Sequence, residues 1–479
     1  MKFYKYLNEK DNIDWKEHIN NNEELKIALE IMKKIDDLGY ESLIVGGFVR
    51  DILLGIESSD IDIATNMPPE EIENHFNTFD IGKNKQFGVN VITYKGHQFE
   101  IAQYRKDIYN SLEGRKGAEE VELVSDFKED AARRDFTINS LGINYKGEII
   151  DHHGGTNDLK MKKISAVGDP NLRFKEDALR MMRGVRTASK LGFDIEDETK
   201  ETIKKMSGDI TKMSPERIRE ELVKMAGQTG ESFANAIKLL DEVGILEKIM
   251  PEITKLKEFK ETPEFHPEAY EEGRGTVFDH VISALKTNKL KDPMVNLSIL
   301  LHDVGKGVTH KKRNGKHTFY NHAEKSKELI DKIAERLKLT NKERKAILFS
   351  ALNHMKMMHG LEMKPTKILK LVDDENWPIL KAVSYCDDAC RKNLFDEKRF
   401  NDIIHNMEKI YKRWGSKTTN QATKVVDGKR VMKITGLNSG PMVGKIIEKV
   451  TDMIVNKGSK ESIDSLIKKA YKEIERENR

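Results

Sequence analysis

The stretch VGGFVRDILLGIESSDIDIATN, residues 45–66, joins a glycine pair and an arginine to two aspartates one residue apart. Alternating acidic and apolar residues predict a strand over Asp60–Ala64. Because strand side chains alternate between faces, Asp60 and Asp62 are expected on the same face. Two carboxylates this close repel each other, and a divalent cation relieves the repulsion. The pair therefore predicts a cation site.

The glycine pair lies between a predicted buried strand, Ser42–Val45, and a predicted short helix, Asp51–Leu54. Gly46 and Gly47 let backbone N–H groups approach a phosphate closely, and the helix adds its positive end. Arg50 offers a bidentate fork to phosphate oxygens. Taken alone, each feature is more typical of a surface turn. Together, on a strand–turn–helix–strand pattern, they favour phosphoryl transfer by two Mg²⁺ ions.

The rest of the chain changes character with position. Helical spacing predicts a helix over Glu23–Leu38, and alternation predicts strands over Val89–Tyr94 and Gln98–Tyr104 with a turn between them. From about residue 158 amphipathic helical patterns dominate. The predicted fold class is α+β, with a mixed head followed by an all-helical remainder. The expected domains are residues 1–150 (head), 151–255 (neck and body), 256–400 and 401–479 (tail).

Composition restricts the class of protein. The 479 residues are 38% hydrophobic and 34% charged, and no stretch has the roughly 18 apolar residues of a membrane helix. The polar start argues against a signal peptide, so a cytoplasmic protein without membrane contact is expected. Cys386 and Cys390 are expected to be ordinary reduced thiols.

The net charge of the whole chain is only +3, so a surface that binds nucleic acid must be local. Residues 409–433, with eight Lys or Arg against Asp427, are either a solvated face or an RNA contact.

Further motifs accompany the opening one. The stretch LIVGGFVRDILLG followed by DIDIAT resembles the first motif of the nucleotidyltransferase superfamily that includes class II CCA-adding enzymes and bacterial poly(A) polymerases. Further segments resemble motifs of the same family. They are FEIAQYR (99–105), RRDFTINSLG (133–142), DHHGGTNDL (151–159), DPNLRFKEDALRMMRGVRTASKLGF (169–193), MSPERIREEL (213–222) and ITGLNSGPMVGKIIE (434–448). The resemblance implies a polymerase-beta-like head, with the tail segment contacting tRNA.

The resemblance also implies site residues. Glu100 would be the third carboxylate beside Asp60 and Asp62, and together they would hold Mg²⁺. Asp135 would hold the ribose 2′-hydroxyl, assisted by Arg134. The full implied nucleotide-binding set is Gly46, Gly47, Arg50, Arg134, Asp135, Asn139, Glu176, Asp177, Arg180 and Arg183.

The EDxxR segment suggests how a base is chosen. Glu176, Asp177 and Arg180 fall on a predicted helix, where Asp177 and Arg180, three apart, share a face. An acceptor beside a guanidinium donor matches the pairing edges of cytosine and adenine, whereas uracil and guanine present the wrong polarity. By spacing alone this is an ordinary surface ion pair. The resemblance implies selection of CTP and ATP without a template, with Glu176 steadying Arg180.

The polar stretch Lys106–Glu120, with Gly114, Gly117 and Arg115, has two interpretations. It is a passive connector, or it is the family's flexible element that helps switch specificity from C to A. Its retained length favours addition of the whole CCA end.

A second set of ligand-type residues follows. His280, His302, Asp303 and Asp387 are the expected ligands, with His322 and His354 as further candidates. Imidazoles and carboxylates suit Mg²⁺ or a divalent transition metal at an open hydrolytic site. Their order resembles the HD phosphohydrolase domain.

Two departures from that domain are present. The third histidine lies in Asn321-His322-Ala323 where relatives more often have Gly-His-Glu, and Asp388 beside Asp387 is an alternative ligand. The domain is either a phosphatase or 2′,3′-cyclic phosphodiesterase, or a scaffold for RNA.

The favoured function is CCA addition to tRNA from CTP and ATP, by a monomer or homodimer. One alternative is a poly(A) polymerase on the same scaffold; those enzymes usually end in an extended basic segment, whereas this chain ends in KKAYKEIERENR. The other alternative is an HD phosphohydrolase whose head only binds RNA.

Overall fold

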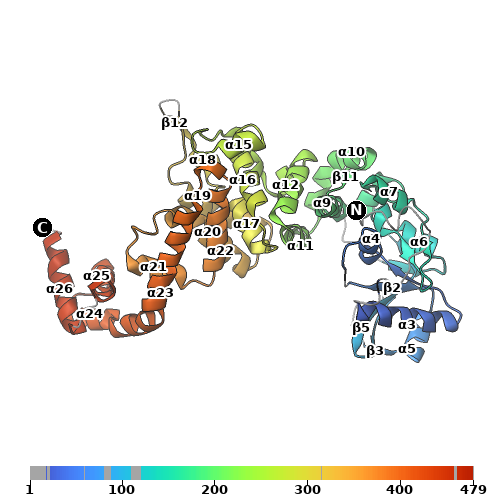
Figure 1. Ribbon diagram of the computed structural model, residues 1–479, viewed down its shortest axis with the longest axis horizontal. Coiled ribbons are helices and arrows are strands. Elements are labelled where there is room, and N and C mark those ends of the chain that lie inside the picture. Colours follow the sequence, from blue (N-terminus) through green and yellow to red (C-terminus); the bar gives the residue numbers. More distant parts are fainter. Residues whose placement is uncertain are drawn as a thin grey trace. The chain divides into compact units, whose positions relative to one another are not determined.

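The computed structural model describes residue 18 and residues 22–58, 60–79, 88–108, 120–313, 316–457 and 461–477; for 413–425, 454–457 and 477 it describes the backbone alone. The chain divides into two compact units. The first unit comprises Met1–Gln228 and Asn235–Pro251, and the second comprises Thr229–Ala234 and Glu252–Arg479. Figure 1 traces both units along the chain. The four-part division predicted from sequence stays a prediction.

A seven-stranded sheet with strand order β3-β4-β5-β2-β1-β8-β9 organises the first unit. Its strands are β1 (Ser42–Val45), β2 (Asp62–Thr65), β3 (Asn77–Phe79), β4 (Val89–Tyr94), β5 (His97–Gln103), β8 (Gly142–Ile143) and β9 (Ile149–Ile150). Strands β2 and β5 are parallel, and the other neighbours are antiparallel. A separate antiparallel pair is formed by β6 (Arg105–Ile108) and β7 (Glu120–Leu123).

Helices surround and follow this sheet. They are α3 (Glu23–Asp37), α4 (Gly47–Leu53), α5 (Pro69–His75), α6 (Phe127–Ala132), α7 (Gly155–Met161), α8 (Pro170–Glu176), α9 (Leu179–Leu191), α10 (Asp197–Met206), α11 (Pro215–Ala226), α12 (Gly230–Glu242) and α13 (Ile245–Ile249). The first turn of α12, up to Ala234, belongs to the second unit. The 3₁₀ turns η2 (Thr137–Asn139) and η3 (Ser207–Lys212) and the parallel pair β10 (Lys163–Ile164) and β11 (Asp194–Ile195) complete the unit.

The predicted mixed head followed by a helical remainder is confirmed, and β4 has the predicted bounds. Other predicted boundaries differ. Strand β5 lies one residue earlier than the predicted Gln98–Tyr104, and α3 ends one residue before the predicted Leu38. Two larger differences have a structural reason. Helix α4 begins at Gly47 rather than Asp51, because Gly46 makes the turn with a φ of 77° and the apolar residues after Gly47 already pack into the core. Strand β2 begins at Asp62 rather than Asp60, because β1 ends at Val45, the pairing partner of Asp62.

The second unit is helical. It contains α14 (Pro251–Thr254), α15 (Pro267–Glu272), α16 (Val277–Thr287), α17 (Pro293–Leu301), α18 (Lys306–Thr309), α19 (His322–Arg336), α20 (Asn341–Met357), α21 (Pro365–Val372), α22 (Trp377–Ala389), α23 (Glu397–Val425), α24 (Gly428–Thr435), α25 (Pro441–Lys457) and α26 (Ile463–Glu477), with η4 (Lys255–Glu258) and η5 (Lys392–Leu394). An antiparallel hairpin, β12 (Lys311–Arg313) and β13 (Lys316–Thr318), is its exception to an all-helical remainder. In the described part of the chain no helix is long and apolar enough to cross a membrane.

Two predicted stretches lie partly outside the described residues. Of the polar stretch 106–120, residues 109–119 fall outside, and its ends belong to β6 and β7 rather than to a loop. Of the basic stretch 409–433, the side chains of 413–425 fall outside, and the backbone continues as α23 through Gly415 to Val425. Both interpretations of this stretch stay predictions.

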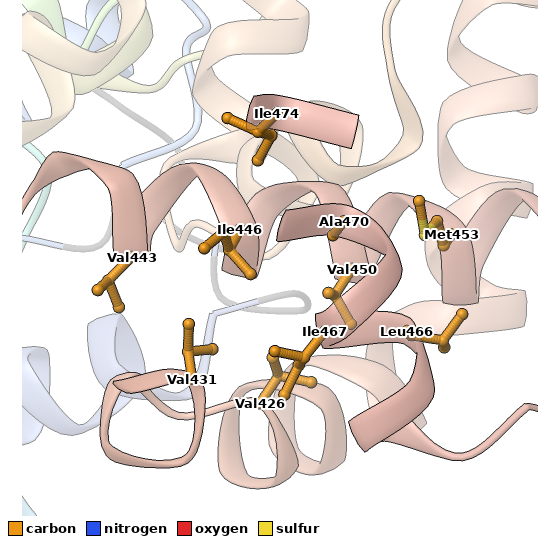
Figure 2. Packing of buried hydrophobic residues seen from close by; sticks show 10 residues of the cluster. All are labelled: Val426, Val431, Val443, Ile446, Val450, Met453, Leu466, Ile467, Ala470 and Ile474. Atoms are coloured by element: carbon orange, nitrogen blue, oxygen red, sulfur yellow. The ribbon is translucent and has the colours of Figure 1, made fainter. Parts of the chain in front are cut away.

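The last three helices have an apolar core of their own, shown in Figure 2. Ile446 and Val450 of α25 are fully buried, and Ile467 and Ala470 of α26 pack in the same cluster. Val431 of α24 closes it. A hydrogen bond of 2.6 Å from the Thr366 hydroxyl of α21 to Asp452 connects this cluster's helices to the rest of the unit.

We expect Ile446→Ala to loosen this C-terminal core. Removing a fully buried isoleucine costs about 2–5 kcal/mol of unfolding free energy, from lost burial and the cavity left behind. Ile447→Ala, next along the helix but only partly buried, is the matched control and should cost less than half as much. Hydrogen exchange of peptides from α25 and α26 measures both, and equal losses of protection would contradict the observed packing.

Candidate active site and metal centre

The three predicted carboxylates come from two neighbouring central strands of the sheet and from the residues just before one of them. Asp62 begins β2, and the parallel register places it beside Glu100 of β5, so the two side chains share a face. Asp60 lies just before the strand rather than in it, which corrects the predicted shared-strand geometry. All three carboxylates nevertheless line one pocket.

The electrostatics of this corner favour a cation. The pKa of Asp62 is raised to about 6, because its carboxylate is partly removed from water and because Asp60 and Glu100 add like charges, while Arg134 opposes the shift. Within the described residues, none of the three carboxylates forms an ion pair with Lys, Arg or His. A divalent cation would supply the missing positive charge, and the oxygen donors suit Mg²⁺. The residues present therefore fit the metal that the sequence predicts.

The phosphate side of the pocket begins at the glycine turn. The first N–H groups of α4, from Gly47 on, have no carbonyl partner within the helix. The guanidinium of Arg50 donates to Asp51 and to Asn139, each at 2.7 Å, and only 8% of the residue is exposed. A side chain at Gly46 would need a strained positive φ and would lie 3.6 Å from both Arg134 and Asp62. The turn thus lies beside Asp62 and beside Arg134 of the RRDFTINSLG segment, residues 133–142, which we call the second motif.

The second motif is held together by hydrogen bonds. The Asn139 amide donates to Asp135 at 3.1 Å, and Arg183 of α9 pairs with Asp135 at 2.7 Å. Burial alone would raise the pKa of Asp135, but the charge of Arg183 and the Asn139 hydrogen bond outweigh it and lower the pKa below its usual value. Arg134 is held by Asp130 at 2.9 Å. Sequence reasoning missed Asp130, a nearly fully buried carboxylate that also pairs with Arg133.

The EDxxR segment departs from the prediction. Helix α8 ends at Glu176, and Asp177 has an extended backbone and accepts a hydrogen bond from the Leu179 N–H at 3.0 Å. Asp177 and Arg180 are therefore not on one helix face, because the chain breaks between α8 and α9. Arg180 instead pairs with Glu176 at 2.5 Å, consistent with the predicted steadying.

Asp177 has a different partner. Arg217 of α11, in the MSPERIREEL segment, donates to Asp177 at 2.7 Å. Arg180 also donates to the Arg133 carbonyl at 2.9 Å and to the Arg173 carbonyl at 3.2 Å. These bonds fix the planes of both side chains. Sequence spacing gave no signal for Arg217, because the contact joins residues 40 positions apart.

One pocket of about 670 Å³ brings these residues together. Of the predicted residues, its lining includes Gly46, Gly47, Arg50, Asp60, Asp62, Glu100, Arg134, Asp135, Asn139, Asp177, Arg180 and Arg183. Glu176 is not among the lining residues, but it pairs with Arg180, which is. Arg105, Arg133, Arg186 and Lys190 also line the pocket and were not predicted. A pocket that joins many cations to a carboxylate corner fits a triphosphate with its metal ions.

The second unit contains a cluster of four histidines, and in each of them Nδ1 lies within hydrogen-bond distance of an oxygen atom. Nδ1 of His302, His322 and His354 lies 2.7–2.9 Å from the backbone carbonyl three residues earlier. Nδ1 of His280 lies 2.8 Å from a carboxylate of Glu268. Since carbonyls and carboxylates accept, each Nδ1 carries a proton, and the bond directs Nε2 of each ring toward the other members of the cluster.

Two aspartates lie among these nitrogens. Asp303 approaches Nε2 of His302 and His322 at 3.2 Å each, and Nε2 of His354 at 3.6 Å. Asp387 lies 3.1 Å from Nε2 of His280. Nε2 of His280 and of His302 and one oxygen of Asp303 are buried without a hydrogen-bond partner. Buried polar atoms in that state are costly, and a metal ion would satisfy all of them.

The charges agree with a cation site. Burial disfavours a charged His302, but Asp303 and Asp387 outweigh it and raise the pKa to about 9. Despite burial, the histidines hold the pKa of Asp303 and of Asp387 well below the usual range. The predicted alternative ligand, Asp388, pairs with Arg391 instead. All six predicted residues of this site thus come together.

A supporting layer was not predicted. Glu268 of α15 is 2% exposed and contacts both His280 at 2.8 Å and His266 at 3.0 Å. Burial opposes its charge, but the hydrogen bonds from these histidines lower the pKa of Glu268 to about 2. Lys306 bridges Asp303 and Glu261, each at 2.7 Å. Lys306 was visible in the sequence three residues after Asp303, whereas Glu268 and Glu261 are revealed by the fold alone.

Comparison with protein families matches three segments. Residues 42–165 match the poly A polymerase head domain, 192–257 the probable RNA and SrmB-binding site of polymerase A, and 282–376 the HD domain. Residues 42–165 are thus similar to a poly A polymerase head domain, and residues 282–376 are similar to an HD domain. Both kinds of domain imply use of divalent metal ions, and the histidine cluster of the second unit contains groups of side chains that could hold one.

Curated relatives with similar sequences are CCA-adding enzymes. That of Bacillus pumilus is 39% identical over 229 residues, 48% of this chain and 56% of the relative. That of Enterococcus faecalis is 43% identical over 203 residues, 42% of this chain and 49% of the relative. The chain therefore spans about half the length of the curated relatives it matches.

Solved structures resemble the whole fold. The Bacillus stearothermophilus CCA-adding enzyme in complex with CTP has a TM-score of 0.69 at 24% identity, over 94% of this chain and 98% of that one. The Thermotoga maritima CCA-adding enzyme complexed with tRNA has a TM-score of 0.52 at 19% identity, over 99% of each chain. At these identities the likeness is one of fold, and it confirms the predicted α+β class.

We expect Glu268→Gln to weaken metal binding at the histidine cluster about 10–100-fold, because the neutral amide no longer fixes the His280 ring as the carboxylate does. Titration calorimetry with Mn²⁺, Ni²⁺ or Fe²⁺ on the full chain measures the affinity. Glu271→Gln, on the same helix but exposed, is the matched control and should change nothing. Unchanged affinity in Glu268→Gln would show that its contact with His280 has no bearing on the metal.

Proposed function

We propose that the chain adds C, C and A to the 3′ end of tRNA from CTP and ATP, without a nucleic-acid template. The observation that carries the proposal is the pocket in which the carboxylate corner, the glycine turn and the EDxxR segment meet. The similarity of residues 42–165 to the poly A polymerase head, and of about half of the chain to CCA-adding enzymes, supports it.

In this proposal Asp60, Asp62 and Glu100 hold Mg²⁺. Bound there, the ions supply charge stabilisation to the attacking 3′-oxygen and the leaving pyrophosphate. The glycine turn and Arg50 bind the triphosphate, because they offer unpartnered N–H groups and a guanidinium in the same pocket. The bond that forms joins the RNA 3′-oxygen to the α-phosphorus, and the bond that breaks releases pyrophosphate.

The sugar and the base are held by the other two segments. Asp135, kept charged by Arg183, accepts a hydrogen bond from the ribose 2′-hydroxyl. Asp177 and Arg180 present an acceptor and a donor to the base, a polarity that cytosine and adenine satisfy. Their planes are fixed by Arg217 and by the Arg133 carbonyl, so the edge exists before a nucleotide enters.

We expect the full chain to extend a tRNA that ends before CCA by two residues with CTP alone and to complete the end when ATP is added. Asp62→Asn should lower kcat/KM by at least about 10³-fold, the scale of several kcal/mol of lost transition-state stabilisation. A single-nucleotide extension assay with Mg²⁺ measures both. Asp37→Asn, at an exposed position on α3, is the control.

The same assay separates the alternatives. Unlimited A addition with ATP alone would establish a poly(A) polymerase and overturn the CCA proposal. Full biological activity in Asp60→Ala together with its loss in Asp303→Ala would establish the HD phosphohydrolase with an RNA-binding head.

We expect Arg217→Met to relax base selection. Without the 2.7 Å contact Asp177 loses its fixed plane, and discrimination against UTP and GTP should fall about tenfold, within the 1–3 kcal/mol that a good bidentate base contact provides. Ratios of kcat/KM for the four nucleotides measure it. Lys224→Met, on the same helix, is the control. Equal loss with all four nucleotides would mean that Arg217 serves the fold and not selection.

A second function is proposed for the histidine cluster. Its four Nε2 atoms and two carboxylates suit Mg²⁺ or a divalent transition metal, and its open cavity suits hydrolysis of a phosphomonoester or 2′,3′-cyclic phosphate. Hydrolysis of 2′,3′-cyclic nucleotides by the metal-loaded chain tests it, with Asp303→Asn as the inactive variant. A loaded but inactive wild-type protein would favour the scaffold role.

A further inference from the structure

The β12–β13 hairpin of the second unit is strongly basic. Residues 311–318 contain three lysines, one arginine and no acidic residue. Lys311, Lys312, Arg313 and Lys316 are all exposed, and among the described residues none of them forms an ion pair. In Figure 1 the hairpin that carries the β12 label projects away from the helices of its unit.

The register concentrates the charge on one face. Arg313 pairs with Lys316 and Lys311 with Thr318, so three cations lie on the same side of the two strands. Like charges directly opposite each other destabilise a hairpin. The Arg313–Lys316 pair is therefore unfavourable by itself, and a bound polyanion would neutralise it. This charge complementarity indicates a polyanionic partner.

The base of the hairpin forms a wall of the metal centre's cavity. His317 and Thr318 of β13 line a cavity of about 550 Å³ that also contains Asp303, His322 and Asp387. Ring nitrogens of His310 and His317 lie 2.7 Å apart, which ties the strand to the segment just before β12. A chain lying along the hairpin would thus lead directly to the metal ligands.

Exposed aromatic side chains line the same cavity. Tyr320 is 69% exposed and Phe265 is 57% exposed, although both are large apolar rings. The guanidinium of Arg313 lies 6.0 Å from the centre of the Tyr320 ring. Rings beside a cationic track are the combination on which single-stranded nucleic acids bind, with bases stacked on the rings and phosphates on the cations.

We propose that the β12–β13 hairpin is a binding arm for single-stranded RNA. The phosphodiester backbone lies on Lys311, Arg313 and Lys316, and an unpaired base at the RNA end stacks on Tyr320 or Phe265 in the cavity. A duplex end would not free a base for these rings, so the single strand is the fitting partner. The proposal deepens the second proposed function by naming its substrate class, but RNA binding by the hairpin does not require hydrolysis.

The test is the affinity of the full chain for an eight-nucleotide single-stranded RNA with a 3′-phosphate, followed by fluorescence anisotropy at several salt concentrations. Lys311→Gln combined with Lys316→Gln should weaken binding about tenfold. It should also reduce the slope of log affinity against log salt by about 1.4, the value for two phosphate contacts. Since Lys316→Gln removes a like-charge pair, the hairpin itself is not destabilised.

Lys332→Gln combined with Lys342→Gln is the matched control. It removes two exposed lysines from α19 and α20 of the same unit, and affinity should change less than twofold. Equal weakening by both pairs would reveal a general charge effect and overturn the proposal. Equal weakening of duplex RNA, or of an acidic peptide of the same charge, by the hairpin pair would overturn it in favour of another partner.

Location is tested by crosslinking. An RNA with 4-thiouridine at its last position should crosslink to the peptide containing Phe319 and Tyr320, and Tyr320→Ala should remove the crosslink. Crosslinks found in the first unit alone would overturn the proposal. Nucleotide addition to tRNA, assayed on the same preparations, reports on the first pocket separately, so failure of the hairpin proposal and failure of the CCA proposal are distinguishable.

Discussion

The parallel pairing of β2 with β5 is the constraint on which the first unit's pocket depends. Adjacent parallel strands place residues of equal register on the same face, and this register sets Asp62 beside Glu100. On its other side β2 pairs with β1, whose last residue, Val45, also pairs with Gly142 at the end of the second motif. The carboxylates, the glycine turn and the second motif are therefore neighbours because of three strand pairings.

The two clusters use opposite electrostatic designs. In the first unit, the carboxylates Asp60, Asp62 and Glu100 lie near one another, and repulsion from the other two is one cause of the raised pKa of Asp62. In the second unit, imidazoles alternate with carboxylates, and His302 and Lys306 hold the pKa of Asp303 well below its usual range despite burial. Carboxylates alone select hard cations such as Mg²⁺, whereas the mixed set accepts transition metals as well.

Local signals predicted well what depends on neighbours in sequence. The bounds of β4 follow from alternation, and the ligand types of both clusters were visible as residue identities. The EDxxR geometry was predicted wrongly, because helical spacing does not reveal that α8 ends before Asp177 and that the Asp177 side chain accepts a hydrogen bond from the first residue of α9. The contacts of Arg217 and Glu268 join separate segments of the chain, and the residue pattern within one segment does not predict such contacts.

The histidine cluster has a consequence for the second unit as a whole. Three of its rings are anchored to carbonyls of their own chain segment, three residues back, so each ligand keeps its direction only while that turn keeps its shape. An ion held by such rings binds the folded unit and not the unfolded chain, and its binding free energy adds to the stability of α17, α19 and α20 together. The metal would then act as a cross-link between three helices that come from different segments of the chain.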